Sequence, residues 1–263
     1  MEGTKMTRLT VIVSFIIIVL IIATPSYAKI DQKTVVGMWL VDEGDGNITK
    51  DSSVSGNDGE INGAKWVDGK IGKSLEFNGT NNSVSCGKNR NVFDTTDAMT
   101  VSAWLKTPQP TKNFQMFVTH GMAVWELRCN AGSGTVHFCA QVNNVWIDQT
   151  KYSTKTVLLP DTWYHVAGTF DGKRVTTWLN GVDDGSFDAS GTIASSKNPI
   201  NFGKRVEDDN NYFFMGNLDE VAIFNVALDE VGIKEIMKGL SASFAIQASG
   251  KLSTTWGNMK SNQ

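Results

Sequence analysis

Carboxylates are the side chains of this sequence that could do covalent chemistry on a sugar, so their spacing is considered first. Retaining glycoside hydrolysis needs two carboxylates about 5 Å apart, and a strand supplies them from positions i and i+2. No run of the Glu-x-Asp-x-Glu type is present: Glu126 is alone in its strand-like segment, and Asp183 and Asp184 lie in a turn. Asp219 and Glu220 are adjacent, which predicts that they point to opposite faces of a strand.

The histidines give no stronger sign of catalysis. His120, His137 and His165 are isolated from one another and from the cysteines, so a zinc site has little support. His165 has no obvious nucleophile beside it and is interpreted as a satisfied structural residue. The sequence therefore predicts a protein that is not an enzyme, with a polysaccharide-active hydrolase or lyase as the alternative.

Ligand binding is the chemistry that remains. Sugar recognition combines an aromatic platform with amide and carboxylate groups that form hydrogen bonds. The residues that could supply this combination are Trp125, Trp146, Tyr152, Asn143, Asn144 and Asp148. The alternative is that most of the eight tryptophans fill the core, as we expect for Trp39, Trp104, Trp163 and Trp178.

The segment Asp51–Gly59, DSSVSGNDG, is dense in Asp, Asn, Ser and Gly and has no hydrophobic periodicity. Calcium requires several oxygen ligands from carboxylates, amides and carbonyls at once, and a flexible loop of this composition can supply them. The alternative is that these side chains only cap turns without a metal.

These groups must be positioned by strands, and the clearest strand signal is Asp161–Gly181, DTWYHVAGTFDGKRVTTWLNG. Its two apolar runs are separated by Asp171-Gly172 and followed by Asn180-Gly181, dipeptides that tolerate the positive φ of tight hairpin turns. Two such turns predict an antiparallel sheet.

The rest of the chain follows the same pattern of short strands. Met99–Lys106 alternates cleanly between two faces, and Gly216 indicates a bulge within Tyr212–Asn225. One helical pattern is found, at Ala227–Leu240. The fold class predicted is all-β, a two-sheet antiparallel β-sandwich (jellyroll) with one short C-terminal helix. Residues 29–240 form this domain, and residues 241–263 are a polar C-terminal tail.

The overall charge gives no reason to expect nucleic acid as a partner. The net charge is −3, and the 24 basic residues are scattered among 27 acidic ones, so no basic stripe is present to follow phosphates.

The first 28 residues have the layout of a signal peptide. Lys5 and Arg8 precede an apolar run from Leu9 to Ala23, and Ser26-Tyr27-Ala28 fits a small-residue cleavage site. Cleavage near Ala28 predicts a secreted, extracellular or periplasmic protein. The run falls short of the about 18 apolar residues of a membrane span. A membrane association is expected only if this segment stays uncleaved, which is the alternative.

Three cysteines are present. Cys129 and Cys139 lie in neighbouring strand-like runs, and a symmetric hairpin places Cys129 opposite Val136 and Cys139 opposite Glu126, too far out of register for a disulfide. Cys86 could pair with either, but an odd count leaves one thiol free. Buried free cysteines are the favoured interpretation.

Several segments resemble the laminin-G-like jellyroll domains of the concanavalin A-like lectin and glucanase superfamily. They span about residues 36–240 and are GMWLVDEGDGN, DSSVSGNDGEI, GKIGKSLEFNGTNNSVSCG, MTVSAWLK, TWYHVAGTFDGKRVTTWLNG, INFGKR and FMGNLDEVAIFNVALDEVGIKEI. The resemblance implies two packed antiparallel sheets, a face used for glycans or proteins, and commonly a structural calcium ion.

By the same resemblance, the calcium ligands are Asp51, Asn57, the carbonyl of Gly59, and Asp219 from the last strand. The function expected is a secreted, non-catalytic, calcium-stabilised recognition module whose partner is a glycan or an extracellular protein surface. A purely structural or protein-interaction (adhesion) module is the alternative, because fold alone does not determine function.

Overall fold

The computed structural model describes residues 30–87, 93–121, 124–205 and 212–244. The predicted signal peptide, and the tail from residue 245 onward, lie outside these ranges. Within them, no helix is both long and apolar enough to cross a membrane.

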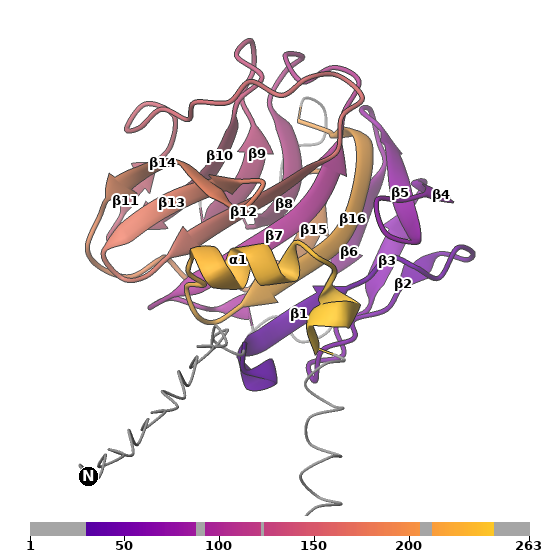
Figure 1. The fold of residues 1–263 in the computed structure, drawn as a ribbon, viewed down its shortest axis with the longest axis horizontal. Helices are drawn as coiled ribbons and strands as arrows, with labels where there is room; N and C mark the ends of the chain where they lie inside the picture. The colour runs from indigo at the N-terminus through magenta and orange to yellow at the C-terminus, as the bar shows by residue number, and fades with distance from the viewer. Residues whose placement is uncertain (1–29, 88–92, 122–123, 206–211, 245–263) are drawn as a thin grey trace, which may run out of the picture.

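The chain forms two antiparallel sheets packed face to face, which confirms the predicted fold class (Figure 1). Sheet A follows the order β14 (Val182–Asp188), β13 (Arg174–Leu179), β12 (Tyr164–Phe170), β7 (Met99–Lys106), β16 (Met215–Phe224), β5 (Lys73–Asn78) and β4 (Lys65–Asp68), and β1 (Val35–Trp39) also pairs with β16. Sheet B follows the order β11 (Val145–Ile147), β10 (Val136–Val142), β9 (Trp125–Cys129), β8 (Gln115–His120), β15 (Ile200–Phe202), β6 (Ser83–Cys86), β3 (Gly59–Asn62) and β2 (Ile48–Thr49).

The predicted hairpin is β12–β13. Val166 pairs with Leu179 and Phe170 with Val175, so the connection turns at Asp171 and Gly172 as the sequence indicates. The Asp171 carboxylate accepts hydrogen bonds from the backbone N–H groups of Lys173 and Arg174, which closes the turn.

The main core lies between the two sheets and is built from apolar side chains of both. Trp39 is fully buried there, as predicted, with its ring edge-on to Phe202. Trp104 is also buried, but on the outer face of sheet A, where its ring contacts His165. Trp163 and Trp178 are only partly buried, so the prediction that they are core residues was wrong in detail.

A second, smaller core covers the outer face of sheet A. Helix α1 (Glu230–Ile236) begins after Asp229, whose carboxylate accepts from the N–H of Gly232, and it lies in front of sheet A in Figure 1. Ile233 and Ile236 pack on Ala167 and Phe224. The helix is shorter than the predicted Ala227–Leu240, and residues 240–244 form a separate helical turn. A 3-10 helix, η1 (Gln32–Thr34), precedes β1.

Strand β16 contains a bulge, but not at Gly216. Met215 and Gly216 pair regularly with Asn78 and Phe77 of β5. The pairing with β7 shifts between Asp219 and Ala222, and Glu220 has a positive φ of 51°. The extra residue turns Glu220 away from the orientation that strict alternation predicts.

The cysteines are free and buried. Cys129 pairs with Val136 and Cys139 with Glu126, which confirms the predicted register. Burial raises the pKa of both thiols to about 12, so they remain protonated at neutral pH. The disulfide considered for Cys86 is not formed in this structure.

Candidate functional site

Four polar side chains form a row across the outer face of sheet A. The strand register pairs Lys65 of β4 with Glu76 of β5, Glu76 with Asn217 of β16, and Asn217 with Lys106 of β7. Residues directly opposite each other on neighbouring strands project from the same face of a sheet, so these four line up side by side. Helix α1 covers a different part of this face, where Ala167 and Phe224 lie.

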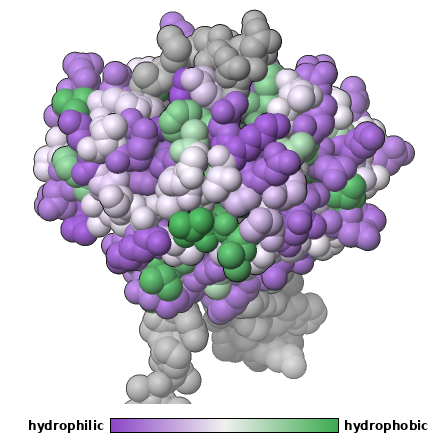
Figure 2. All heavy atoms as spheres, turned by 90° about the horizontal axis from the view of Figure 1, so that it is seen from above, coloured by the Kyte–Doolittle hydropathy of each residue, from purple (hydrophilic) through white to green (hydrophobic). Residues whose placement is uncertain are grey.

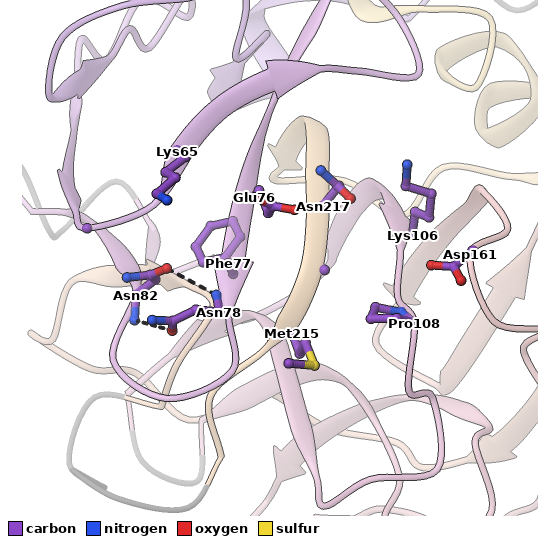
Figure 3. A pocket seen from close by; sticks show the side chains of 12 residues that line it. Lys65, Glu76, Phe77, Asn78, Asn82, Lys106, Pro108, Asp161, Met215 and Asn217 are labelled. Atoms are coloured by element: carbon purple, nitrogen blue, oxygen red, sulfur yellow. Dashed lines mark hydrogen bonds between the residues drawn. The ribbon is translucent and has the colours of Figure 1, made fainter.

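A groove of about 580 Å³ opens over this row. We call it the sheet-A groove; the other residues that line it are Gly63, Phe77, Asn78, Asn82, Pro108, Asp161, Met215 and Gly216. Figure 3 shows Glu76 and Asn217 close together at its centre, with Lys65 on one side and Lys106 on the other. The volume lies within the range of pockets that bind small ligands.

The central polar groups of the groove are not used by the fold. The Glu76 carboxylate and the Asn217 amide form no side-chain hydrogen bond or ion pair with the described residues, although Asn217 is only 8% exposed. Lys106 places its ammonium 5.2 Å from the ring centre of Trp163. Glu76 and Asn217 therefore retain their donors and acceptors for a ligand.

One end of the groove is held by the turn between β5 and β6. Asn82 Oδ1 accepts from the backbone N–H of Asn78 at 3.0 Å, and Asn78 Nδ2 donates to Asn81 Oδ1 at 2.8 Å (Figure 3 shows Asn78 and Asn82). These bonds fix two amide side chains at the edge of the groove. A preorganised edge lowers the entropy lost on binding.

The charges that line the groove cancel. Lys65 and Lys106 contribute two positive charges, and Glu76 and Asp161 contribute two negative ones. A uronic acid or a sulfate would meet as much repulsion as attraction here. The arrangement suits an uncharged ligand with many hydroxyl groups.

The carboxylates among the predicted calcium ligands accept hydrogen bonds from different backbone segments. Asp51 is buried, and its carboxylate accepts hydrogen bonds from the backbone N–H groups of Met38, Ser53 and Asn57. The backbone carbonyl of Asn57 accepts from the indole N–H of Trp39. Gly59 starts β3, and a Cβ placed there would lie 2.6 Å from Val84 Cγ1. Asp51 and Asn57 are thus brought together, as parts of a capped loop.

Asp219, the fourth predicted calcium ligand, binds a different segment. Its Oδ2 accepts from the backbone N–H groups of Lys70 and Ile71, both at 2.9 Å, while its Oδ1 is buried without a partner. Among the residues that the structure describes, no group of three or more His, Cys, Asp or Glu is placed to hold a metal ion. Calcium binding by Asp51, Asn57, Gly59 and Asp219 stays a prediction.

Asp219 and Glu220 form a buried acidic pair, which the sequence did not predict. Glu220 Oε2 accepts from the backbone N–H of Leu240, and Oε1 has no partner. The segments that bind the two carboxyl groups touch each other, since Ile71 Cδ1 lies 3.1 Å from where a Cβ of Gly239 would be. Desolvation, reinforced at Asp219 by Glu220 and at Glu220 by Asp42, raises the pKa of each carboxyl group to about 7.

The predicted sugar-binding residues are also dispersed. Trp125 is 1% exposed and packs in the main core near Phe138, so it cannot serve as a sugar platform, and that assignment was wrong. Trp146 is partly exposed on β11. Asn143 and Asn144 form the β10–β11 turn, both with positive φ, and Asn143 is bonded to the segment 190–192.

Asp148 is partly buried, and Tyr152 is buried and packs with the main core. Asp148 Oδ2 is 4.0 Å from the Arg128 guanidinium, and the Tyr152 hydroxyl is bound to the Phe138 carbonyl and the Thr177 hydroxyl. Nearby, Glu126 is paired with Arg205, whose Nε lies 2.6 Å from Oε1, and with Arg128 at 3.4 Å. The sequence indicates that Glu126 is isolated. In the structure it belongs to a cluster of charged side chains.

The protein-family comparison finds one match. The model described as the concanavalin A-like lectin/glucanases superfamily matches residues 78–234, in agreement with the resemblance seen in the sequence. No curated protein matches the chain.

Solved structures share the fold at low sequence identity. Domain 4 of an extracellular GH43 arabinanase from Geobacillus stearothermophilus, in complex with arabinotriose, is 20% identical, with a TM-score of 0.60 over 77% of this chain and 98% of that one. The binding domain of Paraclostridial Mosquitocidal Protein 1 is 20% identical, with a TM-score of 0.62 over 78% of this chain and 52% of that one. A Trypanosoma rangeli sialidase in complex with 2,3-difluorosialic acid is 14% identical, with a TM-score of 0.58 over 80% of this chain and 33% of that one.

Proposed function

The chain belongs to the concanavalin A-like lectin/glucanases superfamily, and we propose that within it this protein is a secreted, non-catalytic recognition domain that binds carbohydrate in the sheet-A groove. The observation that carries the proposal is the pair of polar side chains, Glu76 and Asn217, which form no side-chain hydrogen bond with the described residues and lie at the centre of an electrically balanced groove. A hydroxylated ligand supplies the donors and acceptors that these groups lack.

The comparisons support the class of ligand. Nearly the whole of the arabinanase domain aligns with this chain, and the structure of that domain was determined in complex with arabinotriose. We take a short neutral oligosaccharide as the ligand class, and arabinotriose as the first probe. Export follows from the signal-peptide layout of residues 1–28 and is part of the proposal.

Replacement of Asn217 by leucine is expected to weaken oligosaccharide binding at least tenfold, about 1.4 kcal/mol, because an apolar side chain of similar size cannot form hydrogen bonds with the ligand. The measurement is calorimetric titration of the purified protein with arabinotriose and, in parallel, a glycan array. The matched control is Asn225→Leu, at an exposed position just after the other end of β16. Equal affinity of the two variants for every glycan bound would contradict the assignment of the groove.

The same experiments separate the alternatives. If the protein binds no glycan on the array but captures an extracellular protein, the result favours the adhesion module. The face seen in Figure 2 is mostly hydrophilic, with its apolar residues in small groups, so it does not present the extended apolar patch common at stable protein interfaces. The sialidase similarity motivates a third measurement. Release of reducing ends from a bound polysaccharide would favour the hydrolase alternative, and it is not expected under the proposal.

Calcium stabilisation remains part of the proposal. If calcium binds the folded chain and not the unfolded chain, it raises the free energy of unfolding, by about 2.7 kcal/mol at a hundredfold excess over Kd. The expected result is a higher melting midpoint in calcium than in a chelator. Identical midpoints in the two buffers would remove calcium from the proposal and leave Asp51 as a purely structural residue.

A further inference from the structure

A second hollow, of about 370 Å³, lies over the outer face of sheet B, away from the sheet-A groove. We call it the sheet-B pocket; its lining residues are Phe114, Asn130, Ala131, Ser133, Thr135, His137, Gln149, Tyr152, Ser153 and Thr154. None of them carries a formal charge when His137 is neutral. Apart from the methyl group of Ala131, hydroxyl, amide and aromatic groups make up the lining.

Two side chains of this pocket keep a buried polar atom without a partner among the described residues. Asn130 is 4% exposed; its Nδ2 donates to Thr135 Oγ1 at 3.4 Å, but its Oδ1 accepts nothing. His137 is 2% exposed; its Nε2 lies 3.0 Å from Thr154 Oγ1, but its Nδ1 is unpaired. Folded proteins pair nearly all such atoms, so two in one pocket call for an explanation.

Burial and a neighbouring charge determine the protonation state of His137. Burial and the nearby Arg128 guanidinium lower its pKa to about 4, so the ring is neutral at physiological pH. A neutral imidazole nitrogen forms hydrogen bonds with hydroxyl groups and offers no charge to an anion. Asn130 Oδ1 likewise accepts from hydroxyl groups.

The charged side chains beneath the pocket also balance one another. Arg128 lies under it, with its guanidinium 4.4 Å from the ring centre of Phe114, and its Nη2 donates to Gln149 Oε1. Its charge is compensated by Glu126 at 3.4 Å and by Asp148 at 4.0 Å. The Arg128 guanidinium therefore holds Phe114 and Gln149 in place in the wall of the pocket and does not attract anions. Phe114, which is partly exposed, supplies apolar surface on which the carbon face of a sugar can pack.

We propose that the sheet-B pocket is a second carbohydrate subsite, which takes one neutral sugar ring whose hydroxyl groups pair with Asn130 Oδ1 and His137 Nδ1. The pocket is smaller than the sheet-A groove, which suits a single ring rather than an oligosaccharide. Because the two sites lie on different sheets, one domain holds two saccharides at once. The proposal extends the proposed function from one site to two and does not depend on the groove.

The test follows the side-chain signals of His137 and Asn130 by NMR while the protein is titrated separately with arabinose, xylose, galactose, glucose and mannose. At least one of these sugars is expected to shift both signals. Ala131→Trp is expected to weaken that response at least tenfold, because Ala131 is an exposed lining residue and a bulky side chain there fills the pocket without touching the buried polar groups. The matched control Ala242→Trp, at an exposed position outside the pocket, is expected to leave it unchanged.

The proposal is overturned if none of the five sugars shifts the two signals, or if Ala131→Trp responds like the control. The groove variant Asn217→Leu separates the two sites. If it abolishes the response of His137 and Asn130, there is only one binding site and the pocket is not it. If it retains that response while the groove binds no oligosaccharide, the second subsite stands and the groove assignment fails.

Discussion

Replacement of Asp51 by alanine is expected to lower the free energy of unfolding by about 3 to 5 kcal/mol. The carboxylate is 8% exposed and accepts three backbone N–H groups, from Met38 at 2.9 Å, Ser53 at 2.9 Å and Asn57 at 2.8 Å. These donors come from β1 and from two places in the following loop, so one side chain closes the loop against sheet A. Alanine leaves three backbone donors without partners, of which those of Met38 and Asn57 are buried and that of Ser53 is partly buried.

Denaturant unfolding of the two proteins measures the effect. The matched control is Asp45→Ala, because Asp45 is exposed and accepts only from the adjacent N–H of Gly46; a change within about 0.5 kcal/mol is expected there. The measurement is repeated in calcium and in a chelator. A loss that is the same in both buffers assigns Asp51 to backbone capping, whereas a loss confined to calcium assigns it to the metal. A loss below about 1 kcal/mol in both contradicts both roles.

The sequence predicts well those parts of the fold that depend on neighbouring residues. The β12–β13 hairpin is specified by Asp171-Gly172, and the register of Cys129 and Cys139 by the short linker between their strands. In each case the turn chemistry and the strand alternation are contained in about twenty residues. Long-range pairing is not required for either prediction.

The sheet-A groove could not be predicted in the same way. Its row joins Lys65, Glu76, Lys106 and Asn217, which come from four strands spread over more than half of the chain. Nothing in the local sequence of β16 indicates that Asn217 lies opposite both Glu76 and Lys106. The bulge at Glu220 has the same origin, because it exists only relative to the pairing of β16 with β7.

The error at Trp125 was avoidable. Alternation places Trp125 on one face of β9 with Leu127 and Cys129, and places Glu126 and Arg128 on the other. Three apolar residues opposite two charged ones indicate which face packs on the core. The face rather than the residue type decides whether a tryptophan is available to a sugar.

Substitution of Asp219 by asparagine, or of Glu220 by glutamine, is expected to stabilise the protein at pH 8 and to stabilise it clearly less at pH 5. In the unfolded chain these carboxyl groups titrate near pH 4, whereas in the folded protein the pKa of each is about 7. Between these values the folded state holds protons that the unfolded state has lost. The stabilising contribution of the pair to the free energy of unfolding is therefore fully present below about pH 4. It declines as the pH rises to about 7 and then stays low.

An amide resembles the protonated carboxyl group and has no charge to desolvate. Asparagine at position 219 can still accept from Lys70 and Ile71, and glutamine at position 220 can still accept from Leu240. The expected gain at pH 8 is about 2 kcal/mol for either variant, less than the full pKa difference implies because the two groups are coupled. The control is Asp68→Asn: Asp68 is exposed, and its hydrogen bond and ion pair with Lys73 lower its pKa, so no gain is expected.

The comparison must be made as variant minus wild type at each pH, because buried histidines act in the opposite direction. Desolvation lowers the pKa of His165 to about 3, so that ring takes up a proton on unfolding and favours the folded state increasingly as the pH rises from about 3 to about 6.5. The wild-type curve mixes the two effects, and a flat profile would not show that either is absent. The difference between variant and wild type removes the histidines, since neither substitution touches them. If that difference is the same at pH 5 and pH 8 for both variants, Asp219 and Glu220 are ionised throughout, and the acidic pair is stabilised by a positive charge or a cation that the fold brings to it.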